Sequence, residues 1–192
     1  MQNPLQDYLS QIPFSAEELK LIFPLIKPLN LNKGEFFVTP ETVGPKISFI
    51  QKGMLRKYIK INNKEFTYHF GVESTSIGAM SIFIESYQSI EYIQAVEDCE
   101  LLVANYPDIV NLFQQSINWA NLGRLIGEKN YIEAHFRMTS LLIHSAEERY
   151  ELLSQRIPEV FQRVPLYQIA SYLGIEPQSL SRIRRNKMKA KK

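Results

Sequence analysis

Residues 168–185 read QIASYLGIEPQSLSRIRR, which is the spacing of two short helices joined by a tight turn. Two helices that cross steeply need a small residue where they approach most closely, and Ala170 meets that need. Gly174 stands at the turn, where a positive φ angle is often required, and Pro177 suits the first turn of a second helix. The pattern predicts either an ordinary amphipathic hairpin or a helix-turn-helix that binds DNA.

The charge of the second helix favours DNA. Leu180 and Ile183 are expected to face inward, which turns polar and basic side chains outward. From Arg182 to Lys192 the chain has seven basic residues and no acidic one, a concentration suited to phosphate contacts. The residues expected to contact DNA are Gln178, Ser179, Ser181, Arg182, Arg184, Arg185 and Lys187.

The composition limits the class of protein. The chain has 192 residues, 45% hydrophobic and 22% charged, with a net charge of +2, so it has room for two modest domains and is no general polyanion binder. A secretory leader and an apolar run near the roughly 18 residues of a membrane span are both missing, so we expect a cytoplasmic protein without membrane contact. Cys99 is the only cysteine, which excludes an intrachain disulfide and argues against an iron–sulfur cluster.

The periodicity of apolar residues changes along the chain. Residues 7–29 have helical spacing interrupted by prolines. Residues 34–106 contain short β-rich runs, EFFV, ISFI, MLRKYIKI, EFTYHF, SIEYIQAV and ELLVAN, which predict an antiparallel barrel or sandwich. Apolar and polar residues alternate on both sides of Asn62 and Asn63, which predicts a hairpin because Asn tolerates the left-handed conformation.

Residues 108–145 predict one long helix. Its apolar residues recur at intervals of seven, and such a stripe faces either a second copy of the chain or the β domain of its own chain. Trp119 lies either at the junction with the β domain or in a dimer seam. Further helices are expected at about 147–155 and around Glu159. The residues expected in a dimer seam are Leu122, Leu125, Ile132 and Phe136.

No pattern of an enzyme or a metal site is present. His69, His135 and His144 are the only histidines, and they are widely spaced without a second ligand nearby. The sequence has no phosphate-binding glycine loop and no nucleophile elbow. We therefore expect no catalytic residue, no metal and no cofactor.

The order of these segments resembles the family of the cyclic AMP receptor protein and FNR, bacterial transcription regulators. The resemblance rests on KGEFF (33–37), QKGMLRKY (51–58), IGAMSIFIESYQSIEYIQAVEDCELL (77–102) and the helical stretch around Gly174. The short C-terminal end and the sequence ASYLGI…SLSRIRR resemble the branch of the family that is common in Bacteroidetes. It implies an α+β fold with a cyclic-nucleotide-binding-like β-roll (jelly roll) at 1–107. A dimerisation helix at 108–145 and a helix-turn-helix domain at 146–192 follow. Few residues follow Arg185, so the wing of that domain is expected to be truncated or absent.

The nucleotide cassette departs from the family pattern. Ala79 follows Gly78 where the family has a Glu that binds the ribose, and the phosphate-binding Arg falls on Ser89. The loss of two charged contacts implies that cyclic AMP does not bind. The pocket then takes a small neutral or weakly polar effector, whose identity the sequence leaves unknown, or is simply filled by side chains. The expected pocket residues are Gly78, Ala79, Met80, Ser81, Ser89 and Ile90.

These observations predict a homodimeric, sequence-specific regulator of transcription that does not respond to cyclic AMP. Its partners would be a second copy and double-stranded DNA with an inverted-repeat operator, with RNA polymerase as a candidate. By resemblance, Gln178 and Arg182 contact bases while Ser179 and Ser181 contact phosphates. The alternative is a sensory or protein-interaction module that has kept the β-roll and lost DNA binding.

Overall fold

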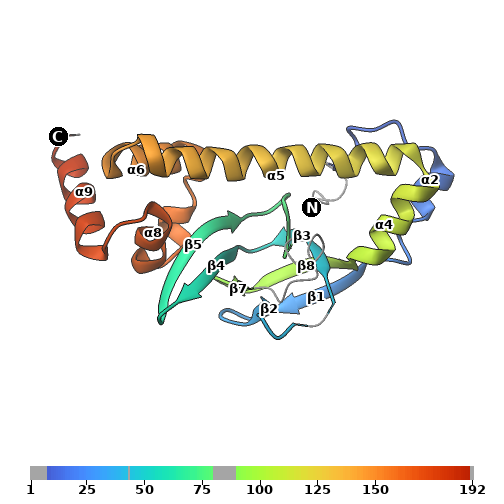
Figure 1. The fold of residues 1–192 in the computed structure, drawn as a ribbon, viewed down its shortest axis with the longest axis horizontal. Helices are drawn as coiled ribbons and strands as arrows, with labels where there is room; N and C mark the ends of the chain where they lie inside the picture. The colour runs from blue at the N-terminus through green and yellow to red at the C-terminus, as the bar shows by residue number, and fades with distance from the viewer. Residues whose placement is uncertain (1–7, 43, 80–89, 191–192) are drawn as a thin grey trace. The chain divides into compact units, whose positions relative to one another are not determined.

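The computed structural model describes residues 8–42, 44–79 and 90–190 and has an α+β fold (Figure 1). The chain divides into two compact units. Unit 1 comprises residues 1–57 and 70–131, and unit 2 comprises residues 58–69 and 132–192. Within the described ranges, no helix is both long and apolar enough to cross a membrane. The finer division at residues 107 and 145 stays a prediction.

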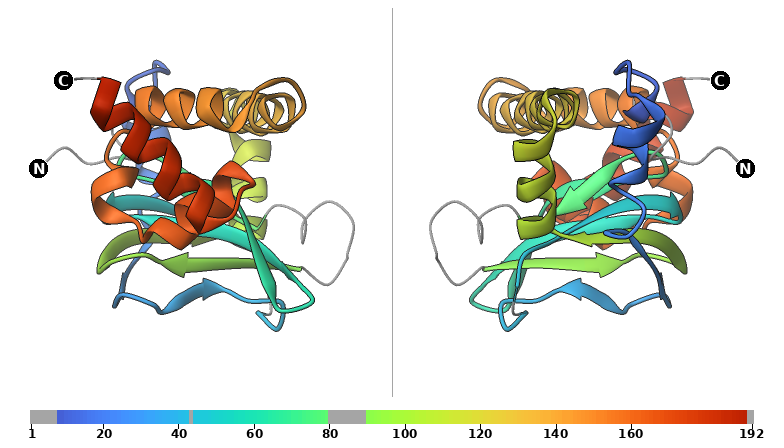
Figure 2. Two further views of the ribbon diagram at one scale, coloured as in Figure 1. Left: turned by 90° about the vertical axis from the view of Figure 1, so that its left-hand side faces the viewer. Right: turned by 90° about the vertical axis from the view of Figure 1, so that its right-hand side faces the viewer.

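The β-rich runs form two four-stranded sheets. Figure 2 shows their strands from two further sides. The pairing is antiparallel wherever strands are joined in the first sheet, as expected for a barrel or sandwich. In order across that sheet lie β1 (Lys27–Leu31), β8 (Cys99–Asn105), β3 (Lys46–Lys52) and β6 (Ser76–Gly78). In order across the second lie β2 (Phe36–Val38), β7 (Glu91–Ala95), β4 (Leu55–Ile61) and β5 (Lys64–Gly71).

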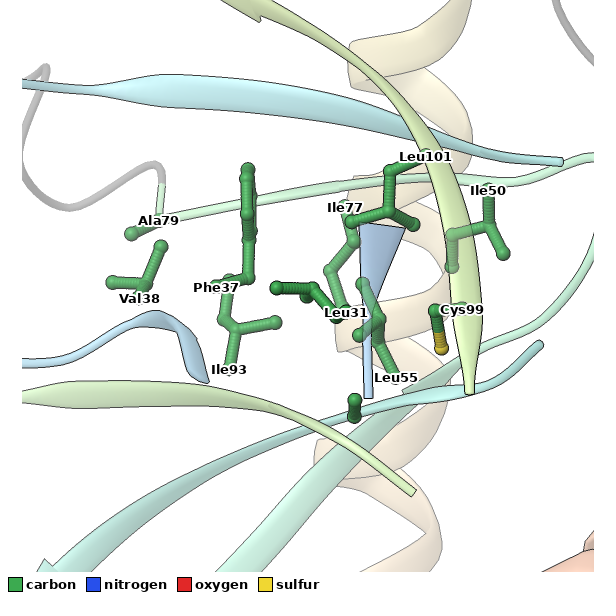
Figure 3. Close-up of a cluster of buried hydrophobic side chains, with 11 residues drawn as sticks. Leu31, Phe37, Val38, Ile50, Leu55, Ile77, Ala79, Ile93, Cys99 and Leu101 are labelled. Carbon is green, nitrogen blue, oxygen red and sulfur yellow. The ribbon is translucent and has the colours of Figure 1, made fainter. Parts of the chain in front are cut away.

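Apolar side chains from both sheets fill the interior of the roll (Figure 3). Ile50 and Leu101 come from the first sheet, and Leu55 and Ile93 from the second, and each is 1% exposed or less. The alternation of the strands puts these residues on the inner faces, where burial of apolar area stabilises the fold. Cys99 lies in the same cluster as a small buried thiol.

The predicted hairpin is confirmed at the turn between β4 and β5. Asn62 has φ 49° and Asn63 has φ 63°, the left-handed values that a two-residue hairpin turn demands. The tip of this hairpin, residues 58–69, belongs to unit 2.

Two of the predicted boundaries are wrong. Residues 27–29 were expected to be helical but begin β1, an edge strand that pairs with β8 and places Leu31 in the core. An edge strand tolerates Pro28 because a missing N–H can face outward. The expected helix over 108–145 is instead α4 (Tyr106–Gln115) and α5 (Ile117–Ile143), separated at Ser116. The Ser116 hydroxyl accepts the N–H groups of Asn118 and Trp119 and so caps α5.

A second core cluster in unit 1 lies on the outer side of β3. It combines Phe49 of β3 with Leu112 of α4 and with Trp119 and Leu122 of α5. The indole of Trp119 donates to the Glu18 carbonyl in α2 (Ala16–Lys20) at 3.0 Å, so this residue lies at the junction with the β domain. Leu122 is 3% exposed, which corrects its assignment to a dimer seam. It packs against its own chain, the alternative that the spacing had left open.

Unit 2 continues with four helices after α5. The helices expected near 147–155 and Glu159 are confirmed as α6 and α7. In α6 the hydroxyl of Ser145 and the carboxylate of Glu148 cap each other's backbone N–H groups. The four are α6 (Ala146–Arg156), α7 (Val160–Arg163), α8 (Leu166–Leu173) and α9 (Pro177–Ala190).

Candidate nucleic-acid interface

The turn between α8 and α9 depends on Gly174. Its φ of 67° is left-handed, as expected from the sequence, and the next residue, Ile175, donates its N–H to the Ala170 carbonyl at 3.0 Å. A Cβ at Gly174 would lie 3.2 Å from Cδ2 of Leu141, so a side chain there is disfavoured by both conformation and space. The chain then enters α9 at Pro177.

Apolar residues fill the space between α8 and α9, where Ala170, Leu180 and Ile183 were expected to pack. Ile169 and Ala170 of α8 and Leu180 of α9 are fully buried. Leu173 and Ile183 are 3% exposed or less, while Ile175 is only partly buried. Burial of these side chains fixes the angle of α9 and with it the direction of every residue on its outer face.

Two arginines hold the C-terminal end of α8, which the sequence reasoning missed. Arg149 Nε donates to the Leu173 carbonyl at 2.9 Å, and Arg137 donates to the Tyr172 carbonyl and stacks on the Tyr172 ring. Cations near a helix C-terminus satisfy its free carbonyls. Burial lowers the pKa of Arg137, and the nearby Arg149 adds to that effect. Neither arginine lies in α9, and both support its position.

The outer face of α9 is polar and basic. Gln178, Arg182 and Arg185 are exposed, and their spacing of four and three places them on one side of the helix. The helix carries five basic residues and no acidic one. Of the other expected contacts, Ser181 is exposed, and Ser179, Arg184 and Lys187 are partly buried.

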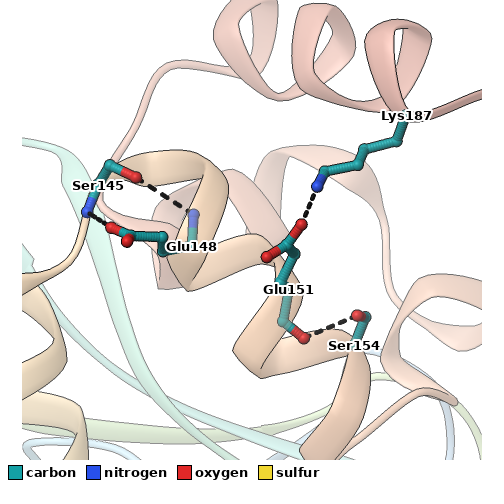
Figure 4. A network of polar contacts seen from close by, with 5 residues as sticks. All are labelled: Ser145, Glu148, Glu151, Ser154 and Lys187. Atoms are coloured by element: carbon teal, nitrogen blue, oxygen red, sulfur yellow. Dashed lines mark hydrogen bonds and ion pairs between the residues drawn. The ribbon is translucent and has the colours of Figure 1, made fainter. Parts of the chain in front are cut away.

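Two of the expected contact residues already have partners in unit 2. Lys187 forms an ion pair with Glu151 of α6 (Figure 4). Ser181 donates its hydroxyl to the Pro177 carbonyl at 3.1 Å, and a hydroxyl has only one proton to donate. A phosphate oxygen can only accept, so Ser181 must break this bond to contact a phosphate.

The tip of the β4–β5 hairpin touches α8 and the turn. The Ser171 hydroxyl donates to the Glu65 carbonyl at 2.7 Å and accepts the Thr67 N–H at 2.9 Å. Lys64 pairs with Glu176, directly before α9, at 2.8 Å. The hairpin is therefore fixed beside the first turn of α9 within unit 2.

Of the six residues expected in an effector pocket, the structure describes Gly78, Ala79 and Ile90. Met80, Ser81 and Ser89 lie outside the described residues. Ala79 is 1% exposed and belongs to the roll core, while Ile90 is exposed.

A lysine beside Gly78 is held in an ion pair, which the sequence reasoning also missed. Lys57 Nζ donates to the Gly78 carbonyl at 2.9 Å and pairs with Glu91 at 3.0 Å, and both side chains of the pair are largely buried. An incoming phosphate would have to compete with the Glu91 carboxylate for this ammonium group.

The later part of α5 exposes apolar residues. Ile132 is 60% exposed and Leu142 77% exposed, while Leu125 is partly buried. Phe136 lies under the guanidinium of Arg156, whose carbon is 4.0 Å from the ring centre. Of the four residues expected in a seam, Ile132 is therefore the most accessible.

Comparison with known proteins identifies the β domain and the fold. Residues 28–116 match the family model of the cyclic nucleotide-binding domain. CooA from Carboxydothermus hydrogenoformans is similar in structure with a TM-score of 0.68 at 17% identity, over 99% of this chain and 86% of CooA. A protein from Eubacterium rectale described as a transcriptional regulator of the Crp/Fnr family has a TM-score of 0.69 at 15% identity, over 94% of this chain and 87% of its own.

The c-di-GMP-responsive global regulator CLP from Xanthomonas campestris is similar to the same degree. Its TM-score is 0.69 at 15% identity, and the match covers 92% of this chain and 93% of CLP. No curated protein sequence matches the chain. The structural neighbours are thus Crp/Fnr transcription regulators, and at these identities they establish the fold of this chain.

Proposed function

We propose that this chain, which has a cyclic nucleotide-binding domain at residues 28–116 and the fold of Crp/Fnr regulators, is a sequence-specific DNA-binding regulator of transcription. In this proposal α8, its turn and α9 are a helix-turn-helix, and α9 is the helix that enters the major groove. The outer face of α9 is the observation that carries it. Gln178 and Arg182 are exposed near its N-terminal end, where a recognition helix contacts base edges.

The side chains on this face suit DNA bases. Glutamine binds adenine and arginine binds guanine through pairs of hydrogen bonds in the major groove. Leu180 and Ile183 lie buried on the opposite side, so the outer face is free to enter a groove. The lack of acidic residues in α9 limits repulsion from phosphates.

We also propose that the regulator is a homodimer that binds an inverted repeat. The exposed apolar residues of α5, Ile132 and Leu142, would be covered by the same helix of a second copy. Two recognition helices related by a two-fold axis reach successive major grooves about 34 Å apart. RNA polymerase stays a candidate partner of such a dimer. We propose that the dimer acts in the cytoplasm.

Cyclic AMP is not the effector in this proposal. The Lys57–Glu91 pair neutralises a cation beside Gly78, and Ala79 offers no carboxylate to a ribose. Calorimetry with cyclic AMP and cyclic GMP should show no binding below about 1 mM. A micromolar dissociation constant for either nucleotide contradicts this part of the proposal.

The main test is selection of DNA sites from a random pool, followed by gel shifts at moderate salt. The wild type should select an inverted repeat. Replacing Arg182 by Ala should weaken binding by roughly 1–3 kcal/mol and relax the preference at one base pair in each half-site. Lys52→Ala removes the same charge from an exposed position in β3 and should leave the preference unchanged.

The opposite result supports the alternative function. If the wild type selects no sequence, or if Arg182→Ala and Lys52→Ala behave alike, α9 does not bind bases. The chain is then a sensory or protein-interaction module.

A further inference from the structure

We propose that a cavity in unit 1 is a binding site for a small, uncharged aromatic molecule. The cavity is lined by residues of α4, the first half of α5 and β3. Figure 1 shows where these three elements lie. Its volume is about 90 Å³, which is room for several waters because one water needs roughly 10–15 Å³. This site does not depend on the proposed function of α9.

The cavity is separate from the interior of the roll. Side chains alternate along β3, so Ile50 points into the roll core while Phe49 belongs to the second core cluster on the outer side. Phe49 and its neighbour on the same face, Ile47, line the cavity. A ligand here would therefore not occupy the cassette around Gly78.

The walls are mostly apolar, and four of the lining residues are aromatic. They include Ile109, Leu112 and Phe113 of α4 and Trp119 and Leu122 of α5. The indole N–H of Trp119 already donates to the Glu18 carbonyl, so this ring needs no hydrogen-bond acceptor from a ligand. Among the described residues that line the cavity, none is an acid or a base. Water gains few hydrogen bonds in such a space, whereas an aromatic ring gains contacts on all sides.

Two glycines of α5 shape the cavity. Gly123 and Gly127 are four residues apart and so lie on one side of the helix. A Cβ at Gly123 would come within 2.5 Å of the Phe113 ring, so glycine lets that ring approach the helix. A Cβ at Gly127 would have no heavy atom within 4 Å, so an alanine would fit and would favour the helix. Glycine at this position keeps the space open.

The size and the entrance set the class of ligand. Trp119 and Leu122 are each 3% exposed, so the walls are part of the folded core and do not form an open face. Gly127 and Asn130 are exposed and form the mouth, and the Asn130 amide can bond one polar group of a ligand. At about 90 Å³ the cavity is smaller than an apolar cavity of about 150 Å³ in another protein that binds benzene, so a single ring is the largest ligand expected.

The experiment uses the full chain and iodobenzene, whose heavy atom quenches tryptophan emission on contact. Trp119 is the only tryptophan, so the signal reports this cavity alone. We expect saturable quenching with a dissociation constant below about 1 mM, which is attainable for so small a ligand. Toluene should compete, and benzoate, a charged ring of similar size, should not, because its carboxylate would be buried without a partner.

The matched variants are Gly127→Leu and Glu128→Leu. Gly127→Leu puts a side chain in the cavity and should weaken iodobenzene binding at least about tenfold, since the ring and the side chain cannot share the space. Glu128→Leu adds the same side chain at the next, exposed position and should leave binding unchanged. Circular dichroism checks the fold, and if Gly127→Leu is unfolded, the competition by toluene but not benzoate in the wild type decides.

Three outcomes would overturn the proposal. The first is linear, non-saturable quenching of the wild type. The second is equal affinity in Gly127→Leu and the wild type. The third is conversion of a dimer to a monomer by Gly127→Leu, because the cavity would then hold a side chain of a second copy.

Discussion

Lys187 and Lys189 lie two residues apart on α9 but differ in their surroundings. Lys187 is paired with Glu151, whereas Lys189 is exposed and the structure gives it no ion pair among the described residues. A cation that is already neutralised releases fewer counterions when DNA binds. The two lysines should therefore contribute unequally to the salt dependence of binding, although the sequence run presents them as equivalent.

The prediction at this scale concerns the slope of log K against log salt. Lys189→Ala should reduce the magnitude of this slope by about 0.9 for each helix that contacts DNA, and Lys187→Ala should change it less. Gel shifts at several salt concentrations measure both slopes. Glu151→Ala, made in the wild-type chain, should release Lys187 from its ion pair and increase the magnitude of the slope. Equal effects of the two lysine substitutions would show that the ion pair does not persist on DNA.

At the scale of elements, Glu18 joins α2 to the start of α5. Its carboxylate accepts hydrogen bonds from Ser116 Oγ at 2.5 Å, from the Ser15 N–H at 2.9 Å and from the Asn118 amide at 3.1 Å. The bond from Ser116, followed by those from Ser15 and Asn118, lowers the pKa of Glu18 to about 2 from its ordinary 4.5. The charged form is therefore favoured in the folded state.

This pKa predicts a dependence of stability on pH. A depressed pKa contributes stability that is present above pH 4.5 and is lost as the pH falls toward about 2. Glu18→Gln should lower the free energy of unfolding at neutral pH and flatten its decline between these two pH values. Denaturant unfolding at a series of pH values measures this. Glu17→Gln, at an exposed position of the same helix, should retain the decline, and an unchanged profile in Glu18→Gln would contradict the assignment.

At the scale of the whole molecule, α5 is the element expected to join two copies. Its first half packs into unit 1 through Trp119 and Leu122, and its second half exposes Ile132 and Leu142. The apolar residues thus change sides along the helix, so one stripe serves the core and another is free for a partner. A charge on the free stripe cannot be desolvated in a seam without a large cost.

We accordingly predict that Ile132→Glu with Leu142→Glu converts a dimer into monomers and weakens binding to an inverted repeat. Light scattering measures the mass, and gel shifts measure the affinity. Gln114→Glu with Gln115→Glu adds the same charge at exposed positions of α4 and should leave the dimer intact. A wild type that is monomeric at micromolar concentration would remove the basis for an inverted-repeat operator.

Local chemistry in the sequence determined the turns and the polarity of the elements. Gly174 and the Asn62–Asn63 pair predict left-handed turns because few residues adopt a positive φ, and both turns are confirmed. The inward direction of Leu180 and Ile183 follows from helical spacing and is also confirmed. A preference for serine at helix N-termini was present at Ser116 and would have divided α4 from α5.

Only the tertiary structure decided features that depend on residues far apart in the chain. Residues 27–31 form a strand because β8, some seventy positions later, supplies its hydrogen-bond partners. The ion pair of Lys57 requires Glu91, and that of Lys187 requires Glu151. The sequence by itself determined the local conformations, since backbone sterics and side-chain periodicity act over a few residues. Burial and charge pairing depend on distances that exist only once the chain has folded. The tertiary structure therefore determined the cavity in unit 1 and the difference between the paired Lys187 and the exposed Lys189 of α9.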